Sequence, residues 1–519
     1  MEKKRFPIGV ENFEALITGG YLYVDKTRYV HDLISSSKYY LLCRPRRFGK
    51  SLLLSTLEAF FLGKRDLFDG LAISKMDVEW KRRPVFHLNF VNLDASSGDE
   101  LRKFLNTQFD DWDKVYGINS GEKPLPQRFQ TLIEAAYAQT GERAVILIDE
   151  YDKPLVTNLD NERLNEELRN ILKPVYANLK RCDGAIAFAL LTGVGRFSRL
   201  SIFSDLNNLR DISMLDRYSA ICGITEEELE EYCRFGVEAL AEESGMSFRE
   251  TLEALKSNYD GYHFSEKSPD IYNPYSLFTA LENRKIGAYW YTTGTPSFLM
   301  KQLRKSRSPL SGLLNEEADE RELQGSDFDG SHPLSLLYQT GYLTIKGYDP
   351  ELETYRLGLP NQEVAKGFFE GLLPCYLDTV KNEALEKVRD LYRDIREGNA
   401  EGFVKRLRTV LAGVPYHLSN ASHEVYFENN LYIIFSLLGF YTTTEYQTSN
   451  GRIDILIDTP SFIYVIELKL DRSAEEALRQ INEKDYCLPF SFSGKKVFKI
   501  GLNFSSRKRN IDDWKIEEC

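Results

Sequence analysis

The sequence predicts an α/β multidomain protein whose first part is a parallel sheet with helices on both faces. Up to about residue 213, apolar runs of strand length alternate with amphipathic segments of helical period. One such run, residues 39–43, is followed by Gly-Lys-Ser at residues 49–51, and another, residues 144–148, ends in two acidic residues. Continuous apolar strands are typical of parallel sheets, which bind ligands at the carboxyl ends of their strands.

Residues 44–51 read Arg-Pro-Arg-Arg-Phe-Gly-Lys-Ser and predict a phosphate-binding loop. They connect an apolar run to residues 52–61, which have the pattern of an amphipathic helix, and this is the context that such a loop requires. Main-chain N–H groups at the start of a helix surround phosphate, and the helix dipole favours its negative charge. We expect Lys50 to reach the β- and γ-phosphates of ATP and the Ser51 hydroxyl to ligate Mg²⁺.

The loop departs from the general phosphate-loop pattern at one position. That pattern has glycine five residues before Gly49, where this chain has Arg44. Because a residue with a Cβ atom suits a left-handed turn poorly, we expect Pro45 to give the loop a different bend. The alternative interpretation is an ordinary junction between a strand and a helix, with Lys50 on the surface.

Two further apolar runs end in residues that suit a nucleotide site. The run that begins at residue 144 ends in Asp149 and Glu150. We expect Asp149 to hold the hydration shell of Mg²⁺ and Glu150 to polarise the attacking water, with a solvated strand end as the alternative. Residues 185–191 are followed by Thr192, which could sense the γ-phosphate or, equally, cap the turn that follows.

Composition limits the classes of function. The chain has 519 residues, 42% of them apolar and 28% charged, which fits about three or four globular domains. A net charge of −12 argues against non-specific coating of nucleic acid, so a nucleic-acid site requires a local basic patch. Seven scattered cysteines without a Cys-x-x-Cys pair favour reduced thiols. With neither a signal peptide nor an apolar run of about 18 residues, we expect a cytoplasmic protein without a membrane partner.

Beyond residue 213 the pattern changes. It becomes helical from Thr225, and aromatic clusters at 258–264 and 272–275 are expected to pack a lid, although exposed rings can also stack on bases. Further along, we expect a loop or linker at 316–331, a winged-helix-like unit at 336–357 and more helices at 363–411. The predicted parts are an NTPase core at 1–215, a helical lid and winged-helix-like region at 216–370, and a helical connector with a second α/β domain at 371–519.

A second candidate site lies on a predicted hairpin late in the chain. Residues 451–458 and 462–469 have the pattern of two strands, and Thr-Pro-Ser between them is a turn signal. Side chains alternate along a strand, so Glu467 and Lys469 share one face. Asp454 falls opposite or diagonal to Glu467, close enough for both carboxylates to share one cation. Without a cation, two juxtaposed carboxylates would be unfavourable.

This arrangement suits metal-dependent cleavage of a phosphodiester. We expect Asp454 and Glu467 to hold Mg²⁺ or Mn²⁺, which polarises the phosphate and lowers the pKa of a bound water. Lys469 would orient that water or stabilise charge that develops on the phosphate. Glu428, on a predicted upstream helix, could add a metal-binding acid, and Gln480, on a downstream helix, could face the same pocket. The alternative is a solvent-facing ion pair between Glu467 and Lys469 on an edge hairpin.

Basic side chains supply two further expectations. An arginine finger could come from Arg196, Arg199 or Arg210, or from a neighbouring subunit. Three short basic clusters are candidates for a polyanion surface, although a solvated face is the commoner explanation. The clusters are Arg44, Arg46 and Arg47; Lys301, Arg304, Lys305 and Arg307; and Arg507, Lys508 and Arg509, the last in the same domain as the hairpin.

With both sites in view, the chain resembles the bacterial AAA-ATPase-like proteins that carry a C-terminal PD-(D/E)XK nuclease-superfamily domain. The resemblance extends over nearly the whole length and rests on short motifs. They are Ile-Gly at 8–9, Tyr-Val-Asp-Lys-Thr at 23–27, the loop 44–51, Leu-Ile-Asp-Glu-Tyr-Asp at 147–152, Thr-Gly-Val at 192–194, Leu-Asn-Asn-Leu at 206–209, Tyr-Asp-Gly-Tyr at 259–262, Tyr-Asn-Pro at 272–274, Gly-Tyr-Leu at 341–343 and Pro-Asn at 360–361.

For the first part of the chain, the resemblance implies a P-loop NTPase core. Lys50, Ser51 and Asp149 would take part in nucleotide and Mg²⁺ binding. The family shares the loop 44–51, so the arginine at its start is no departure from the family. The other expected cofactor-binding residues are Arg46, Arg47, Phe48, Gly49 and Thr192.

For the domain at the end of the chain, the resemblance implies a restriction-endonuclease-like α/β fold. Asp454, Glu467 and Lys469 match the signature of the superfamily, while Glu428 and Gln480 match its flanking helices. The Pro-Asp dipeptide that opens the signature is absent, since an isoleucine precedes Asp454, and the superfamily tolerates this change.

The two sites together predict an ATP-binding and ATP-hydrolysing protein whose nucleotide state gates a metal-dependent nuclease. The expected cofactors are ATP and Mg²⁺, with Mn²⁺ as an option at the nuclease site. The expected partners are nucleic acid, DNA in the first place, and a second copy of the chain. One alternative is a signal-transducing ATPase whose last domain binds nucleic acid or protein without cleavage, and another is a scaffold in which both sites have decayed.

Overall fold

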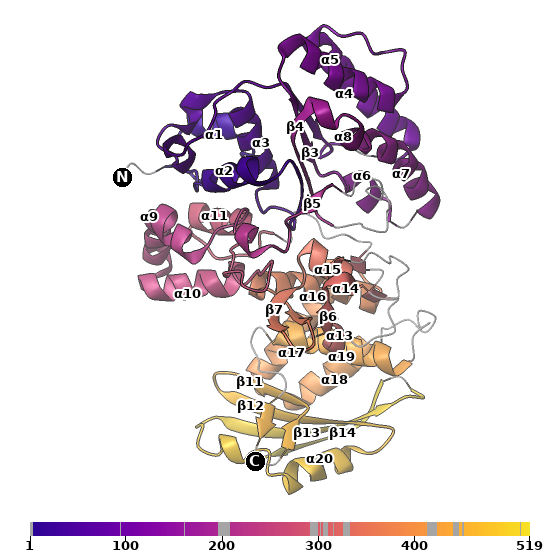
Figure 1. Ribbon diagram of the computed structural model, residues 1–519. Coiled ribbons are helices and arrows are strands. Elements are labelled where there is room, and N and C mark those ends of the chain that lie inside the picture. Colours follow the sequence, from indigo (N-terminus) through magenta and orange to yellow (C-terminus); the bar gives the residue numbers. More distant parts are fainter. Residues whose placement is uncertain are drawn as a thin grey trace. The chain divides into compact units, whose positions relative to one another are not determined.

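The protein is described from a computed structural model and divides into two compact units (Figure 1). The first unit is Met1–Gly294 with Glu316–Val364, and the second is Thr295–Asn315 with Ala365–Cys519. The two boundaries drawn from the sequence, at 215/216 and 370/371, remain predictions. The residues described are 4–93, 95–159, 161–195, 208–290, 299–300, 303–304, 310–314, 316–324, 333–412, 423–439, 446–448, 451–508 and 510–519.

The first unit contains a five-stranded sheet in which every strand pair is parallel, as predicted. Its strands are β1 Tyr39–Cys43, β2 Val85–Asn89, β3 Ala144–Asp149, β4 Ile186–Gly193 and β5 Arg210–Asp211. Their order is β2-β3-β4-β1-β5, so β4 lies between β1 and β3. Because the carboxyl ends of parallel strands meet at one edge, the segments that follow β1, β3 and β4 come together there.

Helices cover both faces of this sheet. Consecutive strand residues point to opposite sides, and every residue of β1 and β3 is buried, so both sides need a cover. The helices are α1 Phe13–Thr18, α2 Thr27–Ser36, α3 Lys50–Phe61, α4 Gly98–Tyr116, α5 Leu125–Thr140, α6 Lys153–Val156, α7 Glu162–Tyr176 and α8 Asn178–Arg181. Tyr39 and Leu41 of β1 belong to the core that α4, α5 and α7 close. Figure 1 shows α1 to α3 on one side of the strands and α4 to α8 on the other.

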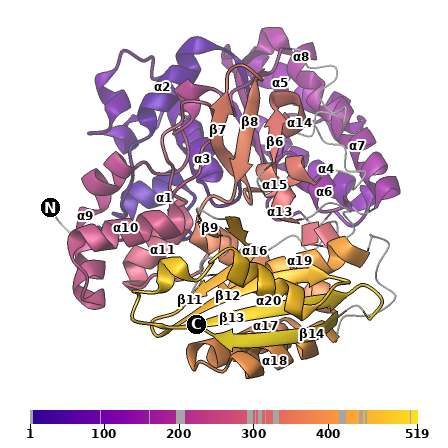
Figure 2. The ribbon, with the colours of Figure 1, turned by 90° about the horizontal axis from the view of Figure 1, so that it is seen from below.

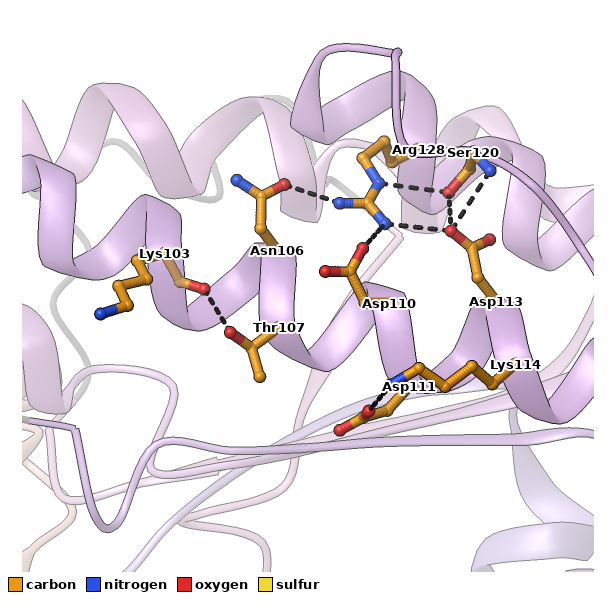
Figure 3. Close-up of polar contacts among 9 residues, drawn as sticks. All are labelled: Lys103, Asn106, Thr107, Asp110, Asp111, Asp113, Lys114, Ser120 and Arg128. Carbon is orange, nitrogen blue, oxygen red and sulfur yellow. Dashed lines mark hydrogen bonds and ion pairs between the residues drawn. The ribbon is translucent and has the colours of Figure 1, made fainter.

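A buried arginine ties α4 to α5 (Figure 3). Arg128 is 2% exposed, and its guanidinium donates hydrogen bonds to Asn106, Asp110, Asp113 and Ser120. The closest are 2.7 Å, to the side-chain oxygens of Asn106 and Asp110. A buried charge satisfied by several partners is stable, whereas removing one partner leaves an uncompensated charge.

The segment predicted to be helical after residue 225 forms α9 Glu226–Ser244, α10 Phe248–Tyr259 and α11 Pro274–Asn283. The side chain of Thr225 accepts the N–H of Glu228, and the Glu228 side chain accepts the N–H of Thr225. This reciprocal capping confirms the predicted start of α9. Leu229, Val237 and Leu277 are fully buried in the core that these helices share.

A small antiparallel sheet, ordered β6-β8-β7, completes the first unit. Its elements are β6 Glu317–Asp319, α14 Glu320–Gln324, α15 Leu334–Thr340, β7 Thr344–Asp349 and β8 Thr354–Gly358. The two strands predicted around Gly347 are confirmed. The loop predicted at 316–331 is wrong for residues 317–324. Asp319 and Glu322 exchange hydrogen bonds with each other's main-chain N–H groups, so acids with the pattern of a linker cap α14.

The second unit combines helices with a four-stranded mixed sheet. Its sheet runs β11-β12-β13-β14, with β12 and β13 parallel and the outer pairs antiparallel. The elements are α13 Leu310–Leu313, α16 Gln362–Leu377, α17 Lys381–Arg396, α18 Ala400–Ala412, α19 His423–Leu438, β9 Tyr446–Thr448, β10 Gly451–Ile453, β11 Ile455–Asp458, β12 Phe462–Leu470, α20 Ala474–Glu483, β13 Lys496–Ser505 and β14 Asn510–Glu518. The helices predicted at 363–411 are confirmed.

Helix α20 makes the crossover that the parallel pair β12 and β13 requires. Leu478 and Ile481 of α20 pack against Leu456, Val465 and Val497 of the sheet. Figure 2 shows α20 lying across these strands. Short 3₁₀ helices occur in both units at η1 Arg65–Phe68, η2 Ala72–Lys75, η3 Asp183–Ala185, η5 Asp216–Tyr218 and η8 Leu488–Phe490. Among the described residues, no helix has both the length and the apolar character needed to cross a membrane.

Candidate nucleotide and metal sites

The phosphate loop, residues 44–51, connects β1 to α3. Its left-handed residues are Arg47, with φ 70°, and Gly49, with φ 95°. Arg44 is not among the residues with positive φ, so the loop does not use a left-handed conformation at that position. Helix α3 begins at Lys50, with half-buried Ser51 in its first turn. The start of α3 presents the free main-chain N–H groups that phosphate binding requires.

Lys50 is only 5% exposed, so the alternative of a surface lysine is wrong. Its Nζ atom donates to the main-chain oxygens of Arg44, at 3.0 Å, and Pro45, at 3.1 Å. A lysine ammonium has three donors, and carbonyl groups of the loop itself accept from two of them. The positive charge is therefore held by the phosphate loop.

Arg44 is 1% exposed and anchors the phosphate loop to the segment that follows β5. Its guanidinium donates to the main-chain oxygens of Ser213, at 2.7 Å, and Tyr218, at 3.0 Å. It also lies 4.1 Å from the centre of the Phe264 ring, a favourable cation–π distance. The expectation that Arg44 belongs to a basic surface is wrong, because the side chain is buried. A local sequence pattern does not reveal such burial.

Aromatic residues from the helical part pack against the phosphate loop. The Phe48 ring meets those of Tyr262 and Phe264 edge-on, with centres 4.8 and 5.3 Å apart. The indole N–H of Trp290 donates to the main-chain oxygen of Arg46 at 3.2 Å. The aromatic cluster 258–264 therefore has a packing role, as expected, and it packs against the phosphate loop.

Arg47 points toward an acid that sequence analysis did not single out. Its guanidinium lies 3.7 Å from Glu11 and 5.0 Å from the centre of the Tyr275 ring. Burial raises the pKa of Glu11, Arg47 lowers it, and the carboxylates of Asp149 and Glu150 raise it further. Glu11 therefore shares an electrostatic environment with the acids at the end of β3.

Asp149 is fully buried, so a solvated strand end is the wrong interpretation for this residue. Its Oδ1 accepts from the hydroxyl of Thr192 at 2.7 Å, so the hydroxyl binds Asp149 and does not cap a turn. Its Oδ2 has no hydrogen-bond partner. Buried carboxylate oxygens rarely lack a donor, and this one fits a hydrated divalent cation. Glu150 follows, half-buried, with a left-handed φ of 50°.

A pocket opens beside the start of α3. Gly49 and Leu52 form one wall, and residues 221–224 form another. Val24 and Phe278 also line it. These predominantly apolar walls suit a flat ring system better than a charged group.

In the second unit, Asp454 lies at a bend between β10 and β11. The single strand predicted at 451–458 is therefore wrong, because the chain breaks at this residue. The bend turns the carboxylate toward β12, where Oδ2 accepts the N–H of Leu468 at 2.9 Å. Ile455 pairs with Ile466. Extending that register by one residue places Asp454 opposite Glu467, as expected.

Glu467 is 2% exposed on an interior strand, so the alternative of a solvent-facing pair on an edge hairpin is wrong. Its Oε1 accepts from Lys469 Nζ at 3.0 Å, and its Oε2 has no hydrogen-bond partner. Burial raises the pKa of Glu467 to about 7, opposed by Lys469 and reinforced by Asp454. A buried carboxylate with an open oxygen fits a cation site, because a cation would offset the cost of its charge.

Gln480 reaches this cluster from α20. Its Oε1 accepts from Lys469 Nζ at 2.7 Å. Its Nε2 donates to the hydroxyl of Tyr486 at 3.4 Å, a contact that sequence analysis missed. The structure thus brings together Asp454, Glu467, Lys469 and Gln480. Within the described part of the chain, no three or more His, Cys, Asp or Glu side chains gather as metal ligands.

Several predicted residues are not placed by the structure. The main chain of Glu428 lies in α19, but its side chain lies outside the described part, as do Arg196, Arg199, Lys301, Lys305, Arg307 and Arg509. Arg210 is exposed on β5. Arg304 lies 3.9 Å from Asp378. The arginine finger and the last two basic clusters therefore stay predictions.

Comparisons with known proteins agree with both kinds of domain. Residues 7–203 match the family model for predicted AAA-ATPases, and residues 422–514 match that of the PD-(D/E)XK nuclease superfamily. An uncharacterised protein in the vnfD 5′ region of Azotobacter chroococcum mcd 1 is 33% identical over 530 residues, covering 100% of this chain and 99% of that protein. The chain belongs to this family of AAA-ATPase-like proteins with a C-terminal nuclease-superfamily domain.

The AAA-ATPase-like protein also has a distant likeness to a solved structure. The ORC2 protein of Aeropyrum pernix, in its ADPNP–ADP complexes, is 14% identical, covering 69% of this chain and 91% of its own. The TM-score is 0.23, too low to carry an argument. The assigned fold depends instead on the parallel strand order of the first unit, the mixed sheet of the second and the two family models.

Proposed function

We propose that the first unit binds and hydrolyses ATP at the edge formed by β1, β3 and β4. The observation that carries this proposal is Asp149 Oδ2, buried and without a partner at the strand edge that also receives the loop holding Lys50. Lys50 would exchange the loop carbonyls for β- and γ-phosphate oxygens, while Ser51 and Asp149 hold Mg²⁺ and its water. Glu150 would polarise the attacking water.

The cavity beside α3 is the proposed site of the adenine ring. A nucleotide whose phosphates lie against the start of α3 has its base within reach of this cavity. The apolar walls would cover the faces of the ring, and main-chain groups of residues 221–224 could meet its polar edge. Phe48 of the phosphate loop also lines this cavity, so the loop proposed to bind phosphate also shapes the proposed base site.

For the second unit, we propose cleavage of a phosphodiester in nucleic acid, with DNA as the first substrate to test. Asp454 and Glu467 would hold Mg²⁺ or Mn²⁺, which supplies polarisation of the phosphate and a water of lowered pKa. Lys469 would donate a hydrogen bond to the phosphate oxygen that gains charge, while Gln480 keeps its ammonium in place. Glu467 must be charged to bind the cation, and the cation would offset the cost of burying that charge.

The proposal links the two sites, with the nucleotide state of the first unit controlling cleavage by the second. Membership of the nuclease superfamily supports nucleic acid as a partner. A homo-oligomer and a cytoplasmic location belong to the same proposal and come from the sequence alone.

The decisive experiment measures cleavage of single- and double-stranded DNA and RNA with Mg²⁺ or Mn²⁺, with and without ATP. Asp454→Ala should lower cleavage about 100-fold or more, because one of two carboxylates beside the phosphate is lost. Lys50→Ala should abolish ATP binding and remove the effect of ATP on cleavage. Asp458→Ala is a matched control, since Asp458 is an exposed acid of β11 that pairs with Lys495.

Each outcome has a distinct meaning. Cleavage that survives Asp454→Ala would come from a contaminant or another site and would overturn the nuclease assignment. ATP hydrolysis without cleavage of any substrate would favour a switch whose last domain only binds. Failure of the wild-type protein to bind ATP would overturn the first half of the proposal.

A further inference from the structure

Asp152 is a buried carboxylate that the proposed reaction leaves without a role. It is 1% exposed and lies in the turn after β3, two residues beyond Glu150. Its Oδ2 accepts the main-chain N–H groups of Val194, at 3.0 Å, and Gly195, at 2.8 Å. A side chain of the β3 turn thus holds the first residues that follow β4.

Other bonds join the same two turns. The N–H of Tyr151 donates to the main-chain oxygen of Thr192 at 3.0 Å, and the Tyr151 hydroxyl donates to that of Gly195 at 2.6 Å. Thr192 in turn donates to Asp149. A Cβ atom on Gly193 would lie 2.6 Å from Asp152 Oδ1, so the close approach depends on glycine. The ends of β3 and β4 therefore form one hydrogen-bonded unit.

The charge of Asp152 is costly in this place. Burial raises its pKa to about 6, the N–H of Gly195 lowers it, and Glu150 raises it further. Lys50 favours the charged form. Oδ1 has no hydrogen-bond partner. The fold nevertheless keeps this carboxylate buried at the turn, where two main-chain N–H groups donate to its Oδ2.

The backbone at Glu150 supplies the reason for such an anchor. Its φ of 50° is a left-handed conformation that a residue with a Cβ atom adopts at some cost, and neighbouring contacts must hold it there. Asp149 fixes the turn on one side through Thr192. Asp152 fixes it on the other side through Val194 and Gly195.

We propose that Asp152 is a positioning residue of the proposed ATPase: by holding residues 194–195, it fixes the turn from which Glu150 acts on the attacking water. The inference rests on the proposed ATPase activity. Asp152 acts through Glu150 and does not touch the nucleotide. Its loss should misplace the Glu150 carboxylate without weakening the binding of ATP.

The test compares kcat and KM for ATP hydrolysis in the full-length protein. Asp152→Ala should lower kcat about 10- to 100-fold and leave KM within about twofold. Asp152→Asn, which keeps one acceptor oxygen, should recover part of the loss. In a Glu150→Gln background, Asp152→Ala should have little further effect, because both changes act on one step.

Asp113→Asn is the matched control, since Asp113 is a half-buried carboxylate that also accepts a main-chain N–H, that of Ser120, but joins α4 to α5. It should leave kcat and KM within about twofold. If the Asp152 variants fail to fold, Gly193→Ala, which displaces Asp152 but keeps its charge, should give the same loss of kcat. An unchanged kcat in these variants, or full additivity with Glu150→Gln, overturns the inference. Absence of ATP hydrolysis in the wild type instead overturns the proposed function.

Discussion

Asp260, in the motif Tyr-Asp-Gly-Tyr, is the side chain whose titration should be most visible in the stability of the first unit. It is 1% exposed, and neither carboxylate oxygen has a hydrogen-bond partner of good geometry. Burial raises its pKa to about 7, partly offset by the N–H of Gly261 and reinforced by Asp270. The folded state therefore binds a proton at Asp260 more tightly than the unfolded state does.

The proton on Asp260 makes the free energy of unfolding depend on pH. The unfolded pKa is close to 4, so the stabilising effect of the Asp260 proton is complete below about pH 4 and is lost as the pH rises to about 7. Asp260→Asn should leave the free energy of unfolding unchanged at pH 4 and raise it by roughly 2 kcal/mol at pH 8. Denaturant titrations at both pH values measure this.

Asp183→Asn is the control for that experiment. Hydrogen bonds from Lys38 and Tyr39 lower the pKa of Asp183, so its replacement should not stabilise the protein at pH 8. Equal stabilisation by Asp260→Asn at pH 4 and pH 8 would show that Asp260 is not protonated on acidification.

At the residue scale, the sequence predicted Lys50, Asp149 and Glu467 but not how they are held. A strand end or a Gly-Lys-Ser tripeptide is a local signal, readable without the fold. The burial of Arg44 and the anchoring by Asp152 depend on segments more than 40 residues away in the chain, which only the folded structure brings together.

The phosphate loop is the element that should change most when nucleotide binds. For Lys50 to reach phosphate, its bonds to the main-chain oxygens of Arg44 and Pro45 must break. Arg46, the next residue, accepts the indole N–H of Trp290. A rearranged loop should therefore alter the environment of that indole, and tryptophan emission should report it.

We expect MgATP to change the emission of the wild-type protein in a saturable titration. Trp290→Phe should remove most of the change, since the chain's other three tryptophans, Trp80, Trp112 and Trp514, lie outside the contacts of the loop. Lys50→Ala should also remove it, for lack of binding. A change of full size in Trp290→Phe would mean that nucleotide binding leaves this contact undisturbed.

At the element scale, the strands and helices with strong apolar patterns were predicted with nearly correct bounds, as β3 and α3 show. The errors arose where local pattern and tertiary pairing differ. Residues 317–319 form a strand because β8 offers main-chain partners. The strand predicted through Asp454 is interrupted because that carboxylate turns to the N–H of Leu468. Neither partner is visible in a window of local sequence.

At the scale of the whole molecule, the division into two compact units predicts two unfolding transitions. MgATP at about 100 times its Kd should stabilise the first unit by about 2.7 kcal/mol and raise its Tm by a few degrees. Mn²⁺ should raise the Tm of the second unit. Differential scanning calorimetry measures both effects.

Two variants assign the transitions. Lys50→Ala should abolish the shift with MgATP and keep the shift with Mn²⁺, and Asp454→Ala should do the reverse. A single transition that moves with both ligands would mean that the two units unfold as one cooperative block.

The sequence by itself determined the two kinds of domain and the kinds of sheet that carry the two proposed sites. Apolar runs, Gly-Lys-Ser and paired acids are short-range signals, because strand burial and charge placement repeat over a few residues. Only the tertiary structure decided which groups meet: Arg44 with the segment after β5, and Asp152 with the turn after β4. These contacts join residues distant in the chain, and the free energy of burying a charge depends on partners that local sequence does not specify.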